Sequence, residues 1–110
     1  MRKFESGATR DTDTDKLDFE GFNSPVVELR FAQYMHKHRK QADGEMRASD
    51  NWQKGIPKEA YMKSLYRHFM DLWLHHRDNS ELATEQDIEE VLCAIRFNVD
   101  GYLFEEMKKQ

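Results

Sequence analysis

Three segments of this chain repeat apolar side chains every three or four residues, the spacing that places them on one side of an α-helix. The first begins at Ser24-Pro25, a helix cap followed by a proline suited to the first turn. The second covers residues 57–76, and the third covers residues 84–107 with Asp87 as a capping-box acid. No segment indicates strand pairing. The sequence therefore predicts an all-α fold, a small bundle of three main helices.

Each predicted helix has an apolar face that we expect to be packed. The faces comprise Val27, Phe31, Tyr34, Met35 and His38 in the first helix, Tyr61, Leu65, Phe69, Leu72 and Trp73 in the second, and Ile88, Val91, Leu92, Ile95, Val99, Tyr102 and Leu103 in the third. Residues 1–23 are polar and turn-rich, and we interpret them as an irregular N-terminal arm. Residues 24–110 then form the helical domain.

The composition indicates that this domain does not act alone. Charged residues make up 35% of the 110 residues, and the mean hydropathy is −0.95. Three helices of this length would leave apolar faces uncovered, so we expect a homo-oligomer to complete the bundle. The lone Cys93 excludes an internal disulfide and is expected in the core. We find no signal peptide and no membrane span, so the cytoplasm is the expected compartment. The mildly acidic balance disfavours nucleic acid as a partner.

A long polar excursion, residues 39–55, precedes the second helix and is a candidate functional loop. Its end, Asn51-Trp52-Gln53-Lys54-Gly55-Ile56-Pro57, combines an indole with a cation. Trp52 could stack on a base while Lys54 meets a phosphate. Alternatively, the Trp52 ring packs the loop onto the core, and both interpretations are compatible.

Two polar pairs with a three-residue step flank the turn between the second and third predicted helices. His68 and Asp71 form one pair, and Asp87 and Glu90 form the other. If the helices pack antiparallel, these side chains could converge on a divalent cation such as Mg²⁺. In the alternative interpretation, Asp87 only caps a helix, Glu90 is solvated and His68 is an interior histidine.

Several short motifs together carry a resemblance to a known family. They are Phe4 to Asp11, Lys16 to Phe19, Ser24-Pro25, Asn51 to Pro57, Ser64 to His68, Glu89-Glu90 and Phe97-Asn98. From Phe4 to about Tyr102, the chain resembles the phage-associated dATP/dGTP diphosphohydrolase N-terminal-domain family. That family is grouped loosely with the MazG-like all-α nucleotide pyrophosphatases.

The resemblance implies Mg²⁺-assisted hydrolysis of a purine deoxynucleoside triphosphate to monophosphate and pyrophosphate, in the host cytoplasm if a phage encodes the protein. Together, the motifs and the spacings predict a set of site residues. They are His68 and Glu90 for catalysis, Arg10, Trp52, Lys54, Arg67 and Asn98 for nucleotide binding, and Asp71, Asp87 and Glu90 for the metal.

The chain departs from the family pattern at Val91, where many relatives carry a histidine directly after the acidic pair. This departure favours an alternative function, a protein that binds or sequesters a nucleotide without hydrolysing it. Such a protein could be a sponge for the cyclic-nucleotide signals of host defence. A third hypothesis is an interaction protein whose histidines and acids only solvate an oligomer.

Overall fold

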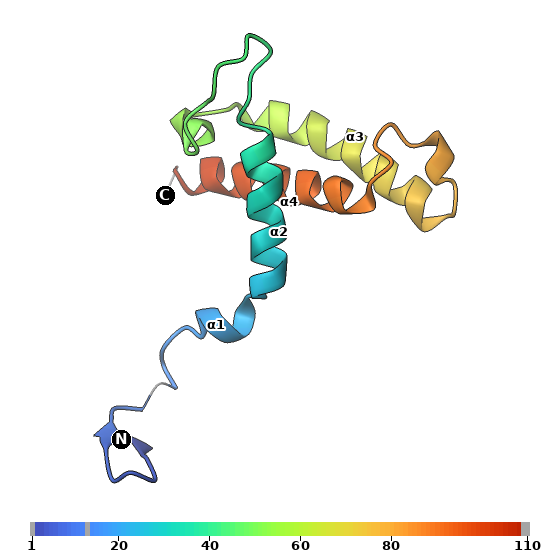
Figure 1. Ribbon diagram of the computed structural model, residues 1–110. Helices are drawn as coiled ribbons and strands as arrows, with labels where there is room; N and C mark the ends of the chain where they lie inside the picture. The colour runs from blue at the N-terminus through green and yellow to red at the C-terminus, as the bar shows by residue number, and fades with distance from the viewer. Residues whose placement is uncertain (1, 13, 109–110) are drawn as a thin grey trace.

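The computed structural model describes residues 2–12 and 14–108 of the chain. Its elements are, in order, strands β1 (Arg2–Lys3) and β2 (Thr9–Arg10), helices α1 (Phe19–Phe22) and α2 (Pro25–Lys37), the 3-10 turn η1 (Asn51–Lys54), α3 (Lys58–His76), the 3-10 turn η2 (Ser80–Leu82) and α4 (Ile88–Met107). The predicted all-α class with three main helices is confirmed. Helices α3 and α4 pack as an antiparallel pair, and α2 crosses α4 on one side of it (Figure 1).

Local signals fix the ends of α2 and α3 where the sequence predicts them. The Ser24 hydroxyl accepts a hydrogen bond from the Val27 amide at the start of α2. At the end of α3, the Asn79 amide donates to the Leu74 carbonyl, while Asp78 adopts a positive φ of 60°. This left-handed residue closes the helix and turns the chain back towards α4.

Helix α4 begins at Ile88, later than the position near Thr84 that the sequence predicts. Asp87 is the N-cap itself, since its carboxylate accepts a hydrogen bond from the Glu89 amide at 2.9 Å. The reason for the delay lies in α3. The buried Asp71 carboxylate takes the amide hydrogens of Thr84 and Glu85, which keeps this segment out of the helix.

The core lies where α2, α3 and α4 meet. Tyr34, Cys93 and Ala94 are buried together, and Phe31, Met35 and Phe97 pack against them. Gly101 lets α4 approach Tyr61 of α3, because a methyl group at this position would overlap the phenol ring. Cys93 is buried as expected, and burial raises the pKa of its thiol.

The arm differs from the expectation that the chain has no strand pairing. Strands β1 and β2 form a short antiparallel ladder in which Arg2 pairs with Arg10 and Lys3 with Thr9. Within residues 2–12 and 14–108, neither these strands nor α1 pack on another element. The arm therefore extends away from the three-helix unit (Figure 1), with Phe19 and Phe22 exposed.

In α3, two side chains predicted to be packed, Phe69 and Trp73, are half exposed. Each residue rotates a helix by about 100°, so α3 presents Tyr61 to α4 while Phe69 and Trp73 lie about a third of a turn away. Other positions predicted to be packed are exposed as well, namely Val27 of α2 and Ile88, Leu92, Val99 and Leu103 of α4. The apolar spacing locates these helices correctly but assigns part of each predicted face to the wrong side.

Candidate functional site: a cationic pocket beside helix α2

A pocket of about 280 Å³ lies where α2, the loop that follows it, α3 and α4 meet. Each of the three main helices contributes to its wall. The lining residues are Tyr34, Met35, His38, Arg39, Arg47, Ala48, Ser49, Asn51, Trp52, Ile56, Ser64, His68, Phe97 and Asn98. The candidate functional loop and the three-helix core therefore form one site.

Residues 39–47 fold back on themselves as a small hairpin. The Arg47 amide donates to the Arg39 carbonyl at 2.8 Å, and the Arg39 Nε donates to the Arg47 carbonyl at 2.9 Å. Lys40 and Met46 form an isolated antiparallel bridge, and Gly44 turns the tip with a φ of 87°. These bonds hold both arginines at the rim of the pocket.

Aromatic rings make up much of the wall. The Tyr34 and His38 rings lie 4.3 Å apart between centroids, and Trp52 meets the Phe97 ring edge-on at 6.3 Å. Trp52 also contacts Phe104, so it packs the loop onto α4 and lines the pocket at once. The packing interpretation is therefore confirmed, whereas stacking on a base stays a prediction. Burial, together with the nearby Glu90 carboxylate, raises the pKa of Tyr34 to about 12, which keeps its phenol neutral.

His68 and Asn98 supply polar atoms deeper in the pocket. Burial lowers the pKa of His68, and the nearby Asp71 carboxylate only partly offsets this effect. The imidazole is therefore neutral at pH 7. Asn98 is buried and donates its Nδ2 hydrogen to the Ala94 carbonyl at 2.8 Å, so its side-chain oxygen is the atom that can accept from a ligand.

The charge of the pocket has one sign. Arg39 and Arg47 line it, and the described lining includes no aspartate or glutamate. Within the part of the chain that the structure describes, neither arginine forms an ion pair. By contrast, the neighbouring cations Arg30 and Lys37 are both paired with acids. The site therefore offers positive charge without a carboxylate of its own to neutralise it.

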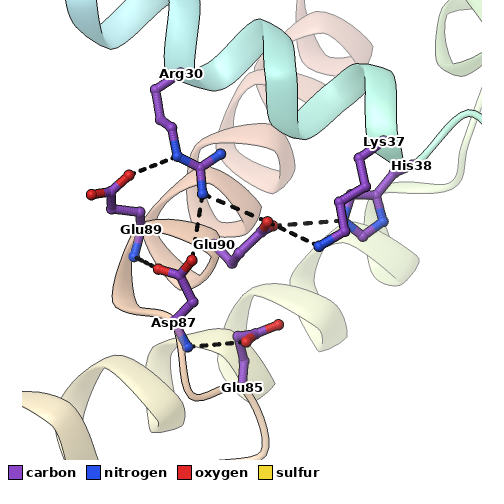
Figure 2. Close-up of polar contacts among 7 residues, drawn as sticks. All are labelled: Arg30, Lys37, His38, Glu85, Asp87, Glu89 and Glu90. Carbon is purple, nitrogen blue, oxygen red and sulfur yellow. Dashed lines mark hydrogen bonds and ion pairs between the residues drawn. The ribbon is translucent and has the colours of Figure 1, made fainter.

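Glu90 lies behind this pocket and ties α4 to α2. Its carboxylate is 3.0 Å from Lys37 Nζ, 3.6 Å from Arg30 Nη2 and 3.8 Å from His38 Nε2 (Figure 2). Burial of Glu90 works to raise its pKa, but the Lys37 hydrogen bond and the surrounding cations outweigh burial and lower it. The carboxylate is therefore ionised and fully engaged.

The predicted metal residues do not share one cluster, which corrects the expectation that they converge. Asp71 accepts from the Thr84 amide at 3.0 Å, the Thr84 hydroxyl at 2.6 Å and the Glu85 amide at 3.1 Å. Asp87 caps α4 and lies 3.7 Å from Arg30, while Glu90 forms ion pairs with Arg30 and Lys37. Each carboxylate already accepts hydrogen bonds or pairs with a cation of the protein, and the Mg²⁺ site stays a prediction.

The predicted nucleotide-binding residues divide into two groups. Trp52 and Asn98 line the pocket, as does the predicted catalytic residue His68. Arg10 lies in the arm, and neither Lys54 nor Arg67 is among the lining residues. Sequence reasoning missed Tyr34, His38, Arg39 and Arg47. The length of the loop was a signal for the two arginines, but the hairpin that positions them depends on contacts that no local pattern records.

The fold and the site together define a class, a small all-α protein with a cationic, aromatic-lined pocket. Comparisons of the chain with family models, with curated proteins and with solved structures find no match. The family resemblance therefore stays a prediction. Among the described helices, none has the length and apolar character needed to cross a bilayer.

Proposed function

We propose that this protein binds a nucleotide in the pocket beside α2 and that binding does not require a metal ion. The observation that carries the proposal is the charge of the lining, with Arg39 and Arg47 present and no acid among the described lining residues. A phosphate group is the natural partner of unpaired guanidinium groups, which recognise it through two parallel hydrogen bonds.

The aromatic side chains favour a ligand that carries a ring as well as a phosphate. Tyr34, His38 and Trp52 offer ring faces or edges to a base, and the Asn98 oxygen can accept from an exocyclic amine such as that of a purine. The cavity of about 280 Å³ lies at the small end of the range for ligand sites. One mononucleotide, or one half of a larger cyclic nucleotide, is the size that fits.

Magnesium-dependent hydrolysis of a purine deoxynucleoside triphosphate is the second candidate. It rests on the family resemblance and on one contact, the ionised Glu90 carboxylate 3.8 Å from the pocket residue His38. In this function His68 and Glu90 are the catalytic residues. The two candidates share a pocket but differ in the fate of the ligand.

A binding experiment with full-length protein in EDTA tests the first candidate. The probes are dAMP, dATP, dGTP, a cyclic purine dinucleotide and unphosphorylated deoxyadenosine, measured by calorimetry and thermal shift. We expect at least one phosphorylated probe to bind and to raise the melting temperature, while deoxyadenosine binds much more weakly. Arg47→Gln should weaken binding by about tenfold or more, the cost of one charge-assisted hydrogen bond.

The matched control is Arg77→Gln, an exposed arginine just beyond α3 and outside the pocket lining. This variant should bind as the wild type does. Equal affinity in Arg47→Gln, or no binding of any probe, would refute the pocket as a nucleotide site. Monophosphate and pyrophosphate released by wild type with Mg²⁺, but not in EDTA, would establish the hydrolase instead.

We further propose that the protein acts in the cytoplasm as a homo-oligomer. The exposed apolar residues of all three main helices support self-association. If a phage encodes the chain, intact recovery of a cyclic nucleotide from heat-denatured complex would identify a sponge for defence signals.

A further inference from the structure

The two arginines of the pocket lie on one hairpin, but only one of them is held in place. The Arg39 Nε donates to the Arg47 carbonyl at 2.9 Å, so the Arg39 guanidinium lies against the opposite side of the hairpin. The Arg47 side chain is exposed, and it forms no hydrogen bond or ion pair within the described residues. One guanidinium is therefore positioned before a ligand arrives, whereas the other is free to close on it.

The positive charge of these two arginines is not offset by a nearby acid of the described chain. Asp43 and Glu45 belong to the same hairpin, but the Asp43 carboxylate accepts from the Glu45 amide and neither residue lines the pocket. Glu90 is engaged by Arg30 and Lys37. Because like charges repel, an anion in the pocket lowers the free energy of both arginines. An anionic group with two negative charges matches the pair, whereas a group with one leaves a cation uncompensated.

The loop that carries the arginines also supplies further hydrogen-bond donors. Ser49 and Asn51 line the pocket, and neither side chain is bonded to another of the described residues. With Arg39 and Arg47 they make up the charged end of the pocket. A terminal phosphate presents one more non-bridging oxygen than a phosphate that links two groups, and every such oxygen accepts from guanidinium, hydroxyl or amide donors. The charged end can therefore bond a terminal phosphate more completely than a phosphodiester.

The helices supply a neutral end to the same pocket, made of Ser64, His68 and Asn98. Asn98 is only 4% exposed, and its Nδ2 donates to the Ala94 carbonyl while its Oδ1 has no bond to any described residue. Ser64 and His68 lie one turn apart on α3, and burial lowers the pKa of the imidazole. A base and a sugar suit these uncharged polar groups, whereas a second phosphate does not. The pocket therefore has room for charge at one end only.

We propose that the pocket selects a nucleoside monophosphate whose phosphate is terminal and doubly charged, and that it discriminates against phosphodiesters. At about pH 7.5 a phosphate monoester carries close to two negative charges and matches Arg39 and Arg47, whereas a diester carries one. The cavity of about 280 Å³ suits one nucleotide. This inference rests on the proposed nucleotide binding and adds the kind of phosphate that the site recognises. It favours a mononucleotide over one half of a cyclic nucleotide.

Calorimetry with the full chain in EDTA at about pH 7.5 tests this preference with three ligands that share one base. They are dAMP, the methyl ester of its phosphate, and 3′,5′-cyclic dAMP, so the last two are diesters. We expect dAMP to bind about tenfold more tightly than either diester, the value of one charge-assisted hydrogen bond. If a diester bound as tightly as dAMP or more tightly, the inference would be overturned while nucleotide binding stood. Absence of binding by all three would overturn the proposed function and this inference with it.

The variant Arg47→Gln tests whether the charged end causes the preference. The hairpin uses the amide and the carbonyl of Arg47 but not its side chain, so the variant should keep the fold. It should weaken dAMP binding about tenfold and diester binding much less, so that the ratio of the two affinities falls towards one. A ratio that stayed at the wild-type value would show that the arginines do not select the phosphate, and would overturn the inference.

The matched control is Asn98→Ala, which changes the neutral end of the same pocket. It should weaken dAMP and the diesters by similar factors, so the ratio of their affinities should stay at the wild-type value. Because Asn98 is buried, circular dichroism should first confirm that the variant is folded, and Ser64→Ala provides the same comparison if it is not. A ratio that fell as far in these variants as in Arg47→Gln would overturn the assignment of the preference to the charged end.

Discussion

Asp71 and Tyr61 are both almost fully buried on α3, but only one of them has its polar atoms bonded. The Asp71 carboxylate accepts three hydrogen bonds from Thr84 and Glu85. The Tyr61 hydroxyl has no hydrogen-bond partner among the described residues. A buried group that is bonded stabilises the fold, whereas one without a partner costs free energy. The two residues should therefore respond to substitution in opposite ways.

Asp71→Asn should lower the free energy of unfolding by about 2 kcal/mol at pH 7, because an amide nitrogen would face a donor and the charge is lost. Burial works to raise the pKa of Asp71, but its three hydrogen bonds bring the pKa below 3.8. The charge therefore contributes stability above pH 3.8, which is lost as the pH falls through the lower native pKa. Denaturant unfolding from pH 7 down to pH 3 should show the two proteins converging at the acid end.

Tyr61→Phe is the control for that experiment, since it removes a buried hydroxyl and keeps the ring that packs on Gly101. Its unfolding free energy should equal that of wild type or exceed it by up to about 1 kcal/mol. If Asp71→Asn were as stable as wild type at pH 7, the carboxylate would not anchor the segment before α4.

At the scale of elements, ion pairs rather than apolar contacts dominate the attachment of α2 beyond the Tyr34 cluster. Arg30 and Lys37 are a little under two turns apart on α2, and both meet Glu90 (Figure 2). Arg30 also pairs with Glu89 at 2.7 Å, and Arg96 of α4 pairs with Glu28 at 3.0 Å. Because Glu90 is the most buried of these acids, it should contribute most to holding α2 in place.

Glu90→Gln should therefore loosen α2 without unfolding the α3–α4 pair. If the free energy that holds α2 on the α3–α4 pair falls by about 1–2 kcal/mol, the population of molecules with α2 detached rises by a factor of about 5–30. Hydrogen exchange measured by mass spectrometry should accelerate by that factor in residues 25–37 and stay unchanged in the middle of α3. Glu59→Gln removes an exposed ion pair with Lys63 and should leave the exchange rates of both segments unchanged. Uniform acceleration across all helices would contradict a local role for Glu90.

The same elements show how far the sequence can be interpreted. The Ser24 cap, Pro57 and the apolar spacing located α2 and α3 correctly, because these signals act within one helical turn. The start of α4 was misplaced because Asp71, 13 residues from Thr84, competes for its amide hydrogens. The site was predicted in part. Trp52, His68 and Asn98 meet in the pocket, but Arg39 and Arg47 reach it through a hairpin whose bonds depend on the tertiary fold.

At the scale of the whole molecule, the described residues form a three-helix unit and an arm that extends from it (Figure 1). The radius of gyration is 19.1 Å, whereas a compact chain of this length has about 13 Å. The arm accounts for much of this difference, since its strands contact only each other among the elements of the described residues. Arg10, predicted to bind nucleotide, is therefore separated from the pocket within one chain.

Removal of residues 1–17, which leaves α1 intact, should have little effect on the three-helix unit. We expect the thermal midpoint to stay within about 2 °C of the full chain, because no packed apolar surface is lost. Nucleotide affinity should also be unchanged, since the pocket belongs to residues 34–98. Arg10→Gln in the full chain separates the two possible failures. If truncation and Arg10→Gln both weakened nucleotide binding, the arm would reach a pocket in the assembled protein, as the family resemblance implies. If truncation alone dissociated the proposed homo-oligomer, the arm of one copy would be bound to another copy.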